Sequence, residues 1–283
     1  MSIKLGLLAI GASMVMASSA LATTATTIIS DTFPSTQGIG SGAYLQGSSP
    51  DTGPTGATWT THYDGSTGLV APTTAQAPFI STNSAGADAA IFPDSYGGNV
   101  DAAIAFTPVN SNGVLTLTAT LNFVGGEWIG MGFAPSATNA DPSVSTGPWA
   151  LMTGSGSTVQ LFGKNGSRNL VPTTKLTSST NTLSLSYDPV TTDLTLDVSN
   201  GISGSNYITA SDPLSYFGVT TAPSIGAIFF AVRGGGTTNG SNFSDVTLTQ
   251  GPEQVVPEPA TVGLFGMGAA AGLLLLGRRR KTA

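Results

Sequence analysis

The chain has 283 residues, of which only 24 are charged: nine Lys or Arg and fifteen Asp or Glu, for a net charge of −6. Thr (40) and Ser (32) make up a quarter of it, and Gly (37) with Pro (17) nearly another fifth. A helical bundle is excluded, because the solvent-exposed face of long helices needs many Glu, Lys, Arg and Gln residues, and charged residues are scarce here. A pI near 4.4 excludes a basic surface for nucleic acid. Strands with exposed Thr, joined by Gly, Pro and Ser turns, fit this composition.

The first 22 residues have the form of a secretory signal peptide. Lys4 supplies a positive start, an apolar run extends from residue 5 to about residue 16, and Ala20-Leu21-Ala22 has the A-x-A form that signal peptidase recognises. The apolar run is too short to cross a bilayer comfortably. The pattern therefore predicts export, with cleavage after Ala22.

A three-part segment follows residue 255. It opens with Val256-Pro257-Glu258-Pro259, which lacks two backbone donors and cannot continue a strand or a helix. Residues 260–277 carry no charge and are just long enough for a transmembrane helix. A basic cluster comes next and is expected to stay cytoplasmic, so that the body faces outward. Its members are Arg278, Arg279, Arg280 and Lys281.

This tripartite tail resembles the PEP-CTERM sorting signal of Gram-negative bacteria. The resemblance implies recognition by an integral-membrane transpeptidase of the exosortase type. It also implies a transient inner-membrane anchor, followed by an outer-surface or extracellular destination, often in bacteria that secrete exopolysaccharide. The resemblance covers only the last 28 or so residues and implies nothing about the chemistry of the body. A simple C-terminal membrane anchor is the alternative.

A body, residues 23–250, and a linker, residues 251–259, lie between the two targeting segments. The body and the linker contain four basic residues and all fifteen acidic ones. The net charge of the exported body with its linker is therefore expected to be about −11, compared with −6 for the full chain. The sequence has no Cys, so no disulfide supports the fold and the hydrophobic core must suffice alone. A body of this length is large enough for that.

Period-two alternation predicts that the body is a single antiparallel β-sandwich. Residues 114–121, 182–187 and 193–198 alternate apolar side chains with Thr, Ser or Asp. Residues 224–232 are nearly all apolar, as expected of a central strand covered on both faces, and residues 243–249 alternate again. No helix-period segment and no fixed repeat interrupts this pattern, which favours one all-β domain.

The order of these strands resembles that of the concanavalin A-like (laminin G/lectin) jelly roll. Three short segments carry the resemblance: Asp31-Thr32-Phe33, Tyr187-Asp188-Pro189 and the strand from Phe243 to Leu248. The Gly- and Pro-rich stretch from residue 34 to residue 99 is expected to hold long loops over one end of the sandwich.

Catalytic groups are scarce, and the sequence predicts no catalytic site. A glycosidase needs two carboxyl groups on one surface, yet Glu127 is the only Glu in the body and the E-x-D-x-x-E motif of glucanases is absent. Asp193 and Asp197 share a strand face, where they keep a hairpin soluble. His62 is the only His, and there is no Cys and no G-x-S-x-G motif, which disfavours a serine hydrolase and a zinc site. A polysaccharide hydrolase is the least favoured hypothesis.

Aromatic side chains are the candidates for sugar binding, because an exposed ring stacks on the apolar face of a pyranose. Trp59, His62 and Tyr63 form the best exposed-looking cluster. Trp128 and Trp149 are second choices that fit the core better, since Trp128 precedes an alternating strand.

Calcium is the ion that the composition accommodates best, because its ligands are Asp, Asn and backbone oxygens. Four such residues cluster within fourteen positions: Asp88, Asp94, Asn99 and Asp101. The EF-hand spacing is absent, and the alternative is that these residues form turns. No cofactor is therefore expected, with calcium left open.

Two functional hypotheses remain. The first is a non-enzymatic protein of the cell surface or extracellular matrix, associated with exopolysaccharide or a biofilm. The second is a carbohydrate-binding, lectin-like module, with calcium dependence left open. The expected partners are an exosortase-type enzyme and glycans, and not nucleic acid.

Overall fold

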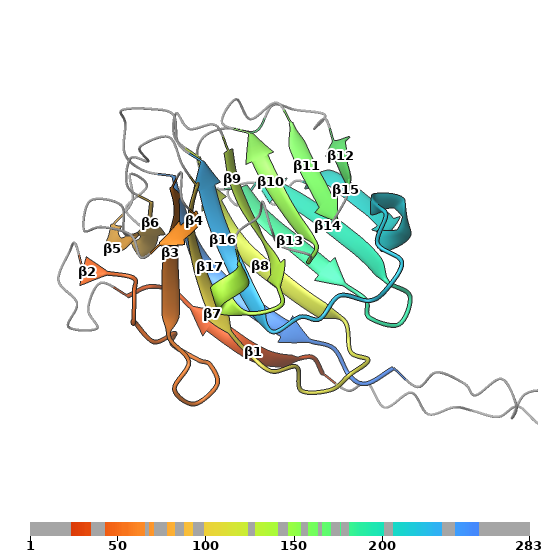
Figure 1. The fold of residues 1–283 in the computed structure, drawn as a ribbon, viewed down its shortest axis with the longest axis horizontal. Coiled ribbons are helices and arrows are strands. Elements are labelled where there is room, and N and C mark those ends of the chain that lie inside the picture. Colours follow the sequence, from red (N-terminus) through yellow and green to blue (C-terminus); the bar gives the residue numbers. More distant parts are fainter. Residues whose placement is uncertain are drawn as a thin grey trace, which may run out of the picture.

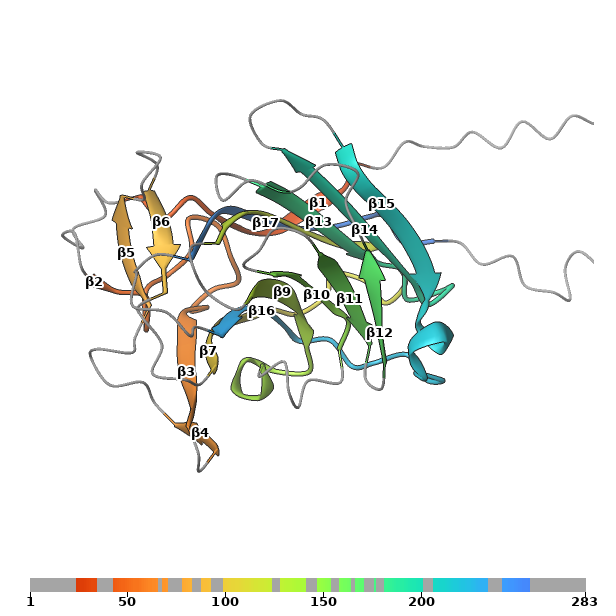
Figure 2. The ribbon, with the colours of Figure 1, turned by 90° about the horizontal axis from the view of Figure 1, so that it is seen from above.

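The computed structural model describes residues 24–34, 43–65, 68–70, 78–82, 88–92, 99–123, 128–140, 147–153, 158–163, 166–170, 176, 181–200, 206–233 and 241–254. Antiparallel strands form two sheets (Figure 1), which Figure 2 shows from above as stacked layers. The predicted all-β sandwich is confirmed for this part of the chain. Two short 3-10 turns accompany the strands: η1, Ala137–Asn139, and η2, Leu214–Phe217.

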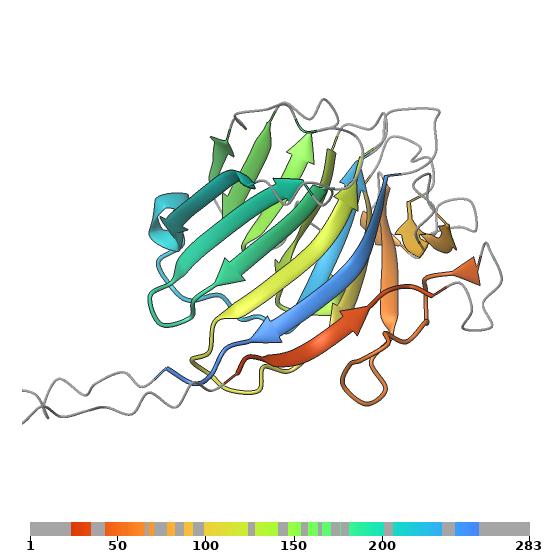
Figure 3. The same cartoon turned by 180° about the vertical axis from the view of Figure 1, so that it is seen from behind.

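One layer is a nine-stranded sheet, seen from behind in Figure 3. β1 (Thr26–Asp31) pairs with the second half of β17, beyond the residues that pair with β6. The other strands are, in spatial order, β15 (Asn206–Pro213), β14 (Asp193–Asn200), β13 (Asn181–Tyr187), β8 (Leu115–Asn122), β17 (Asn242–Gln250), β6 (Asp88–Ile91), β5 (Phe79–Thr82) and β2 (Ala43–Tyr44).

The other layer is an eight-stranded sheet, which lies toward the viewer in Figure 1. An ion pair between Arg168 and Asp212 joins an edge strand of this layer to an edge strand of the first. The strands of the layer are, in spatial order, β12 (Gly166–Leu170), β11 (Val159–Gly163), β10 (Trp149–Thr153), β9 (Trp128–Ala134), β16 (Ala227–Arg233), β7 (Asn99–Ala105), β3 (Trp59–Gly65) and β4 (Gly68–Val70).

Alternation along the strands explains how the two layers enclose a core. In β8, Leu115 and Leu117 are buried between the sheets, whereas Thr116 is only half-buried on the opposite face. The Oγ1 atom of Thr116 lies 2.9 Å from the Oγ atom of Ser186 on β13, so the outer hydroxyl groups pair across neighbouring strands. The abundance of Thr and Ser therefore has a structural use on the outer face of this sheet.

The strands expected from alternation are confirmed, but five further strands in the early part of the body were not predicted. β8, β13, β14, β16 and β17 correspond to the five predicted segments. Between residues 34 and 99, where long loops were expected, the chain forms β2 to β6 and the start of β7. These strands were missed because most of them have only two to four residues, too few for a period of two to be visible.

The two ends of the body lie side by side. Thr26, the first residue of β1, is opposite Gln250, the last residue of β17. Figure 3 shows that the chain consequently enters and leaves the sandwich at the same end.

The predicted targeting segments fall outside the described residues. This applies to the signal peptide with its cleavage site at Ala20 and Ala22, and to the predicted membrane helix after residue 259. Within the ranges that the structure describes, no helix is long and apolar enough to cross a membrane.

Candidate functional site

The outer face of the eight-stranded sheet gathers polar and aromatic side chains. Since register aligns residues of neighbouring strands, these side chains form rows across the sheet. One row combines amides, a carboxylate and an imidazole: Asn169, Gln160, Leu151, Gly130, Ala231, Asp101 and His62. The next row holds most of the rings: Ser167, Phe162, Trp149, Gly132, Phe229, Ala103 and Thr60.

Small residues in the middle of these rows let aromatic rings pack onto the sheet. A Cβ atom added to Gly132 would lie 2.2 Å from the Cβ atom of Trp149, so only glycine fits there. Trp149 and Phe229 form the centre of a second apolar cluster on the outer face, and η1 contacts β7 and β16 above it. β16 is therefore covered on both faces, as its apolar sequence predicts.

An aromatic–amide patch lies at the β9–β12 side of this face, and we define it as Trp128, Trp149, Phe162, Gln160 and Asn169. The Trp149 and Phe162 rings are stacked, with centroids 4.0 Å apart, and the Trp128 centroid lies 5.8 Å from that of Trp149. Trp149 is buried, whereas Trp128 and Phe162 are half-buried. The amide nitrogen of Gln160 donates to Oδ1 of Asn169 over 2.5 Å. Rings and amide groups are therefore accessible together.

The sequence pointed to only two members of this patch. Trp128 and Trp149 were assigned to the core, and both do pack in an apolar cluster, but it lies outside the sandwich and not between the sheets. Phe162, Gln160 and Asn169 were missed. Alternation in β11 places Gln160 and Phe162 on one face, and this signal could have identified them.

His62 and Asp101 form a second polar group at the opposite side of the sheet. The Nδ1 atom of His62 lies 2.9 Å from Oδ1 of Asp101, an ion pair when the ring is protonated. Asp101 is 1% exposed, and His62 is half-buried. Five strand spacings separate His62 from Gln160, about 24 Å at ~4.8 Å per strand. One sugar ring therefore cannot contact both groups.

Trp59 does not belong to either group, and its expected exposure was wrong. β3 directs Trp59 between the sheets and His62 outward, because residues three apart on a strand face opposite sides. The Trp59 ring is fully buried near Phe33 and Phe243, and its indole N–H donates to Oδ2 of Asp31 over 2.7 Å. A buried ring cannot stack on a sugar. Tyr63 also lies on β3, and nothing further is described of its side chain.

Asp31 is an ionisable group inside this aromatic cluster. Its Oδ1 atom accepts the backbone N–H of Phe33 over 2.8 Å, and its side chain is 3% exposed. Burial raises the pKa of Asp31 to about 6, although the hydrogen bonds from Trp59 and Phe33 act in the opposite direction.

The four residues considered for calcium do not form one site in the described part of the chain. Asn99 and Asp101 share the outer face of β7, but Asp88 lies on β6 in the other sheet, and Asp94 is outside the described residues. Among the described residues, no three His, Asp or Glu side chains are close enough to hold a metal ion. In the described part of the chain, Asn99 and Asp101 are thus the two of the four residues that share one face.

Comparison with solved structures finds similarity to lectins. The chain is similar to arcelin-5, a lectin-like defense protein from Phaseolus vulgaris, with 9% identity over 68% of this chain and 92% of that one and a TM-score of 0.43. It is also similar to winged bean acidic lectin in complex with methyl-α-D-galactose, with 10% identity over 69% of this chain and 93% of that one and a TM-score of 0.47. A third similar structure is the exoplasmic/lumenal domain of VIP36 in its Ca2+/Man3GlcNAc-bound form, with 9% identity over 71% of this chain and 89% of that one and a TM-score of 0.46. With TM-scores below 0.5, these similarities go no further than resemblance, and the two-layer sandwich rests on the strand pairing described above.

No curated protein matches the chain in sequence. The family model of the PEP-CTERM protein-sorting motif, however, matches residues 255–281. That range contains Val256-Pro257-Glu258-Pro259 and the Arg278–Arg280 cluster, on which the resemblance rests. Such a motif implies an exported protein that exosortase handles at the membrane. The all-β body is therefore followed by a PEP-CTERM sorting motif.

Proposed function

We propose that this chain is a non-enzymatic protein of the outer surface or extracellular matrix of a Gram-negative bacterium, associated with exopolysaccharide or a biofilm. The observation that carries the proposal is the match of the PEP-CTERM motif to residues 255–281. The signal-peptide pattern of residues 1–22 supports it, because both segments address a protein to the membrane for export. The Thr- and Ser-rich strands supply a hydrated surface rich in hydroxyl groups.

The test is localisation of the body in cells with and without the sorting transpeptidase. We expect cells that lack the enzyme to retain an uncleaved form, with its tail, in the inner-membrane fraction. The same loss of surface material is expected when Val256-Pro257-Glu258-Pro259 is replaced by Ser and Gly. Unchanged release of the body to the surface in either strain would contradict the proposal.

A second candidate function is carbohydrate binding by the aromatic–amide patch. Trp128 and Phe162 offer partly exposed ring faces, and Gln160 with Asn169 offers both donors and acceptors for sugar hydroxyl groups. The stack of Phe162 on Trp149 fixes the orientation of the rings before a ligand arrives, which lowers the entropic cost of binding. From β9 to β12 the patch is about 14 Å wide, at ~4.8 Å per strand. This width suits an oligosaccharide better than a single ring.

A glycan array with the exported protein tests this second function, in the presence and in the absence of a chelator. We expect Trp128→Ala to weaken retained binding by about tenfold, in line with the loss of one stacking ring. Tyr216→Ala is the matched control, because Tyr216 is an exposed ring outside the patch. Equal effects of the two substitutions, or no retained glycan, would eliminate the lectin function. Loss of binding with chelator alone would assign a calcium requirement.

A further inference from the structure

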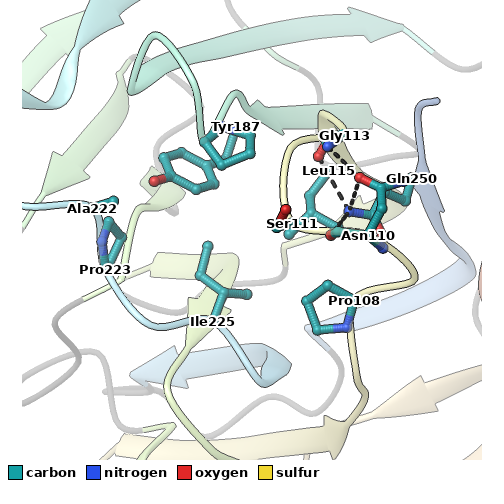
Figure 4. A pocket seen from close by; sticks show the side chains of 11 residues that line it. Pro108, Asn110, Ser111, Gly113, Leu115, Tyr187, Ala222, Pro223, Ile225 and Gln250 are labelled. Carbon is teal, nitrogen blue, oxygen red and sulfur yellow. Dashed lines mark hydrogen bonds between the residues drawn. The ribbon is translucent and has the colours of Figure 1, made fainter. Parts of the chain in front are cut away.

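A pocket of about 240 Å³ opens at the end of the sandwich where the chain leaves it (Figure 4). Its walls come from the segment before β8, the turn after β13 and the segment before β16. The lining is mostly apolar, and residues with exposed apolar side chains, Val109 and Val190, are neighbours of lining residues in the chain. The lining residues used below are Leu115, Tyr187, Pro189, Ala222, Ile225 and Gln250.

The side-chain amide of Gln250 and the nearby backbone form hydrogen bonds with one another. Its Oε1 atom accepts the N–H of Val109 over 2.6 Å, and its Nε2 atom donates to the carbonyl oxygen of Asn110 over 2.8 Å. Gln250 is buried, so these bonds hold the segment before β8 in place. They leave little hydrogen-bonding capacity at this wall for a ligand.

Tyr187 brings to the pocket a hydroxyl group whose hydrogen-bonding capacity is unused among the described residues. Its ring is 2% exposed, and its buried hydroxyl group has no hydrogen-bond partner among the described residues. Figure 4 shows the hydroxyl group pointing toward Ala222 and Pro223. Burial raises the pKa of Tyr187 to about 12, with a further increase from the charge of Asp188, so the hydroxyl stays protonated and can donate. An uncharged apolar ligand with one acceptor fits this wall.

The linker after β17 runs along the rim of the pocket. The N–H of Gly251 donates to the carbonyl oxygen of Val114 over 2.8 Å, beside Leu115. The Nε2 atom of Gln254 donates to Oδ2 of Asp188 over 3.2 Å, beside Pro189. Four residues thus take the chain from one wall of the pocket to the opposite wall.

The residues that follow in the chain have the chemistry that this wall accepts. Val255, Val256 and Pro257 are apolar, and an extended chain of three residues reaches up to about 10 Å. This reach exceeds the dimension of a 240 Å³ pocket, which is about 6 Å across if it is taken as a cube. The carbonyl groups of the segment are acceptors without a charge.

We propose that the start of the sorting motif, Val255–Pro257, docks in this pocket of its own body. Its apolar side chains pack on Pro189, Ala222 and Ile225, and a backbone carbonyl group accepts the Tyr187 hydroxyl. The folded body and the sorting transpeptidase then compete for the same residues. Docking would therefore keep the motif from the transpeptidase until the enzyme displaces the segment from the pocket.

Cysteine cross-linking in the full chain tests the docking, because the sequence contains no other cysteine. Cα atoms must approach within about 7 Å for a disulfide to form. We expect the pair Ala222→Cys and Val256→Cys to oxidise at least about tenfold faster than the control pair Thr191→Cys and Val256→Cys. Thr191 is an exposed neighbour of Asp188 outside the pocket lining, so it is similarly close to the linker. Equal oxidation rates would overturn the proposal.

Tyr187→Phe supplies a second readout that removes only the hydroxyl group. We expect it to slow the Ala222–Val256 cross-link severalfold and to lower the thermal midpoint of the full chain. In a chain with Val255–Pro257 replaced by Ser and Gly, the same substitution should leave the midpoint unchanged or raise it, since an unpartnered buried hydroxyl is unfavourable. The same effect in both chains would show that the hydroxyl does not bind the segment and would also overturn the proposal.

Discussion

Asp31 connects the first strand to the aromatic core, and its charge state is tied to folding. The Trp59 and Phe33 N–H groups both donate to the carboxyl group, yet burial has the larger effect and raises the pKa from 3.8 to about 6. The folded state consequently binds a proton more tightly than the unfolded state. The contribution to stability is therefore fully present below about pH 4 and is lost as the pH rises through about 6.

The first prediction concerns this pH dependence. Between pH 2 and pH 7 the Asp31 contribution to the free energy of unfolding should fall by about 3 kcal/mol, at ~1.4 kcal/mol per pKa unit. Asp31→Asn should remove that slope. It should also lower stability at low pH, because an amide offers one acceptor oxygen to the two N–H groups. Urea unfolding of both proteins at several pH values measures the difference, and parallel pH profiles would contradict it.

Trp59 and His62 show what the sequence can predict at the scale of single residues. Their proximity in the chain made them look like one cluster, but the alternation of β3 already places them on opposite faces. The partner of each was not predictable. Trp59 meets Asp31, 28 positions earlier, and His62 meets Asp101, 39 positions later, and both pairings depend on how the sheets assemble.

Among the elements, long alternating strands were predictable and short ones were not. β8, β13 and β14 have seven or eight residues, and each presents several apolar side chains to one face. β2, β4 and β6 have two to four residues and are formed because neighbouring strands supply their hydrogen bonds. Local sequence carries no signal for such pairing.

β1 is an element whose attachment can be tested. Along its length it pairs with β17 on one side, and on the other Ser30 meets Thr52 at a single bridge. The buried side chain of Ile29 therefore holds the strand in place.

We predict that Ile29→Ala lowers the free energy of unfolding by about 2–5 kcal/mol, because a cavity would replace the buried side chain. Thr26→Ala, at an exposed position of the same strand, should change it by less than about 0.5 kcal/mol. Denaturant unfolding gives both values. Equal losses would mean that β1 is held by backbone hydrogen bonds alone.

For the whole molecule, the sandwich followed from composition and alternation, whereas the outer-face cluster did not. Trp149 and Phe229 pack on the outer face because Gly132 leaves room and η1 covers β16. Neither condition is visible in a linear pattern. The aromatic–amide patch depends on the same packing, so sequence alone assigned Trp128 and Trp149 to a core between the sheets.

Net charge leads to a prediction at this largest scale. Without the two predicted targeting segments, the net charge of the body would be near −11 and would be self-repelling, so NaCl should raise its thermal midpoint by screening. Screening depends on ionic strength and not on the identity of the cation, so MgCl2 and CaCl2 at equal ionic strength should raise it by the same amount. Differential scanning calorimetry in the three salts measures this. A larger shift with CaCl2 would reveal a bound ion, because ligand binding stabilises the folded state by mass action.

The adjacency of Thr26 and Gln250 also determines how the body bears mechanical load. A force applied between the two ends would open β1 from β17 one hydrogen bond at a time, beginning at Thr26, and such unzipping needs little force. A force that pulled the linker along the axis of β17 would instead load this strand lengthwise. Its hydrogen bonds to β1 and β8 lie across that axis and must break together. The resistance of the body to a load on its linker therefore depends on the direction of the pull.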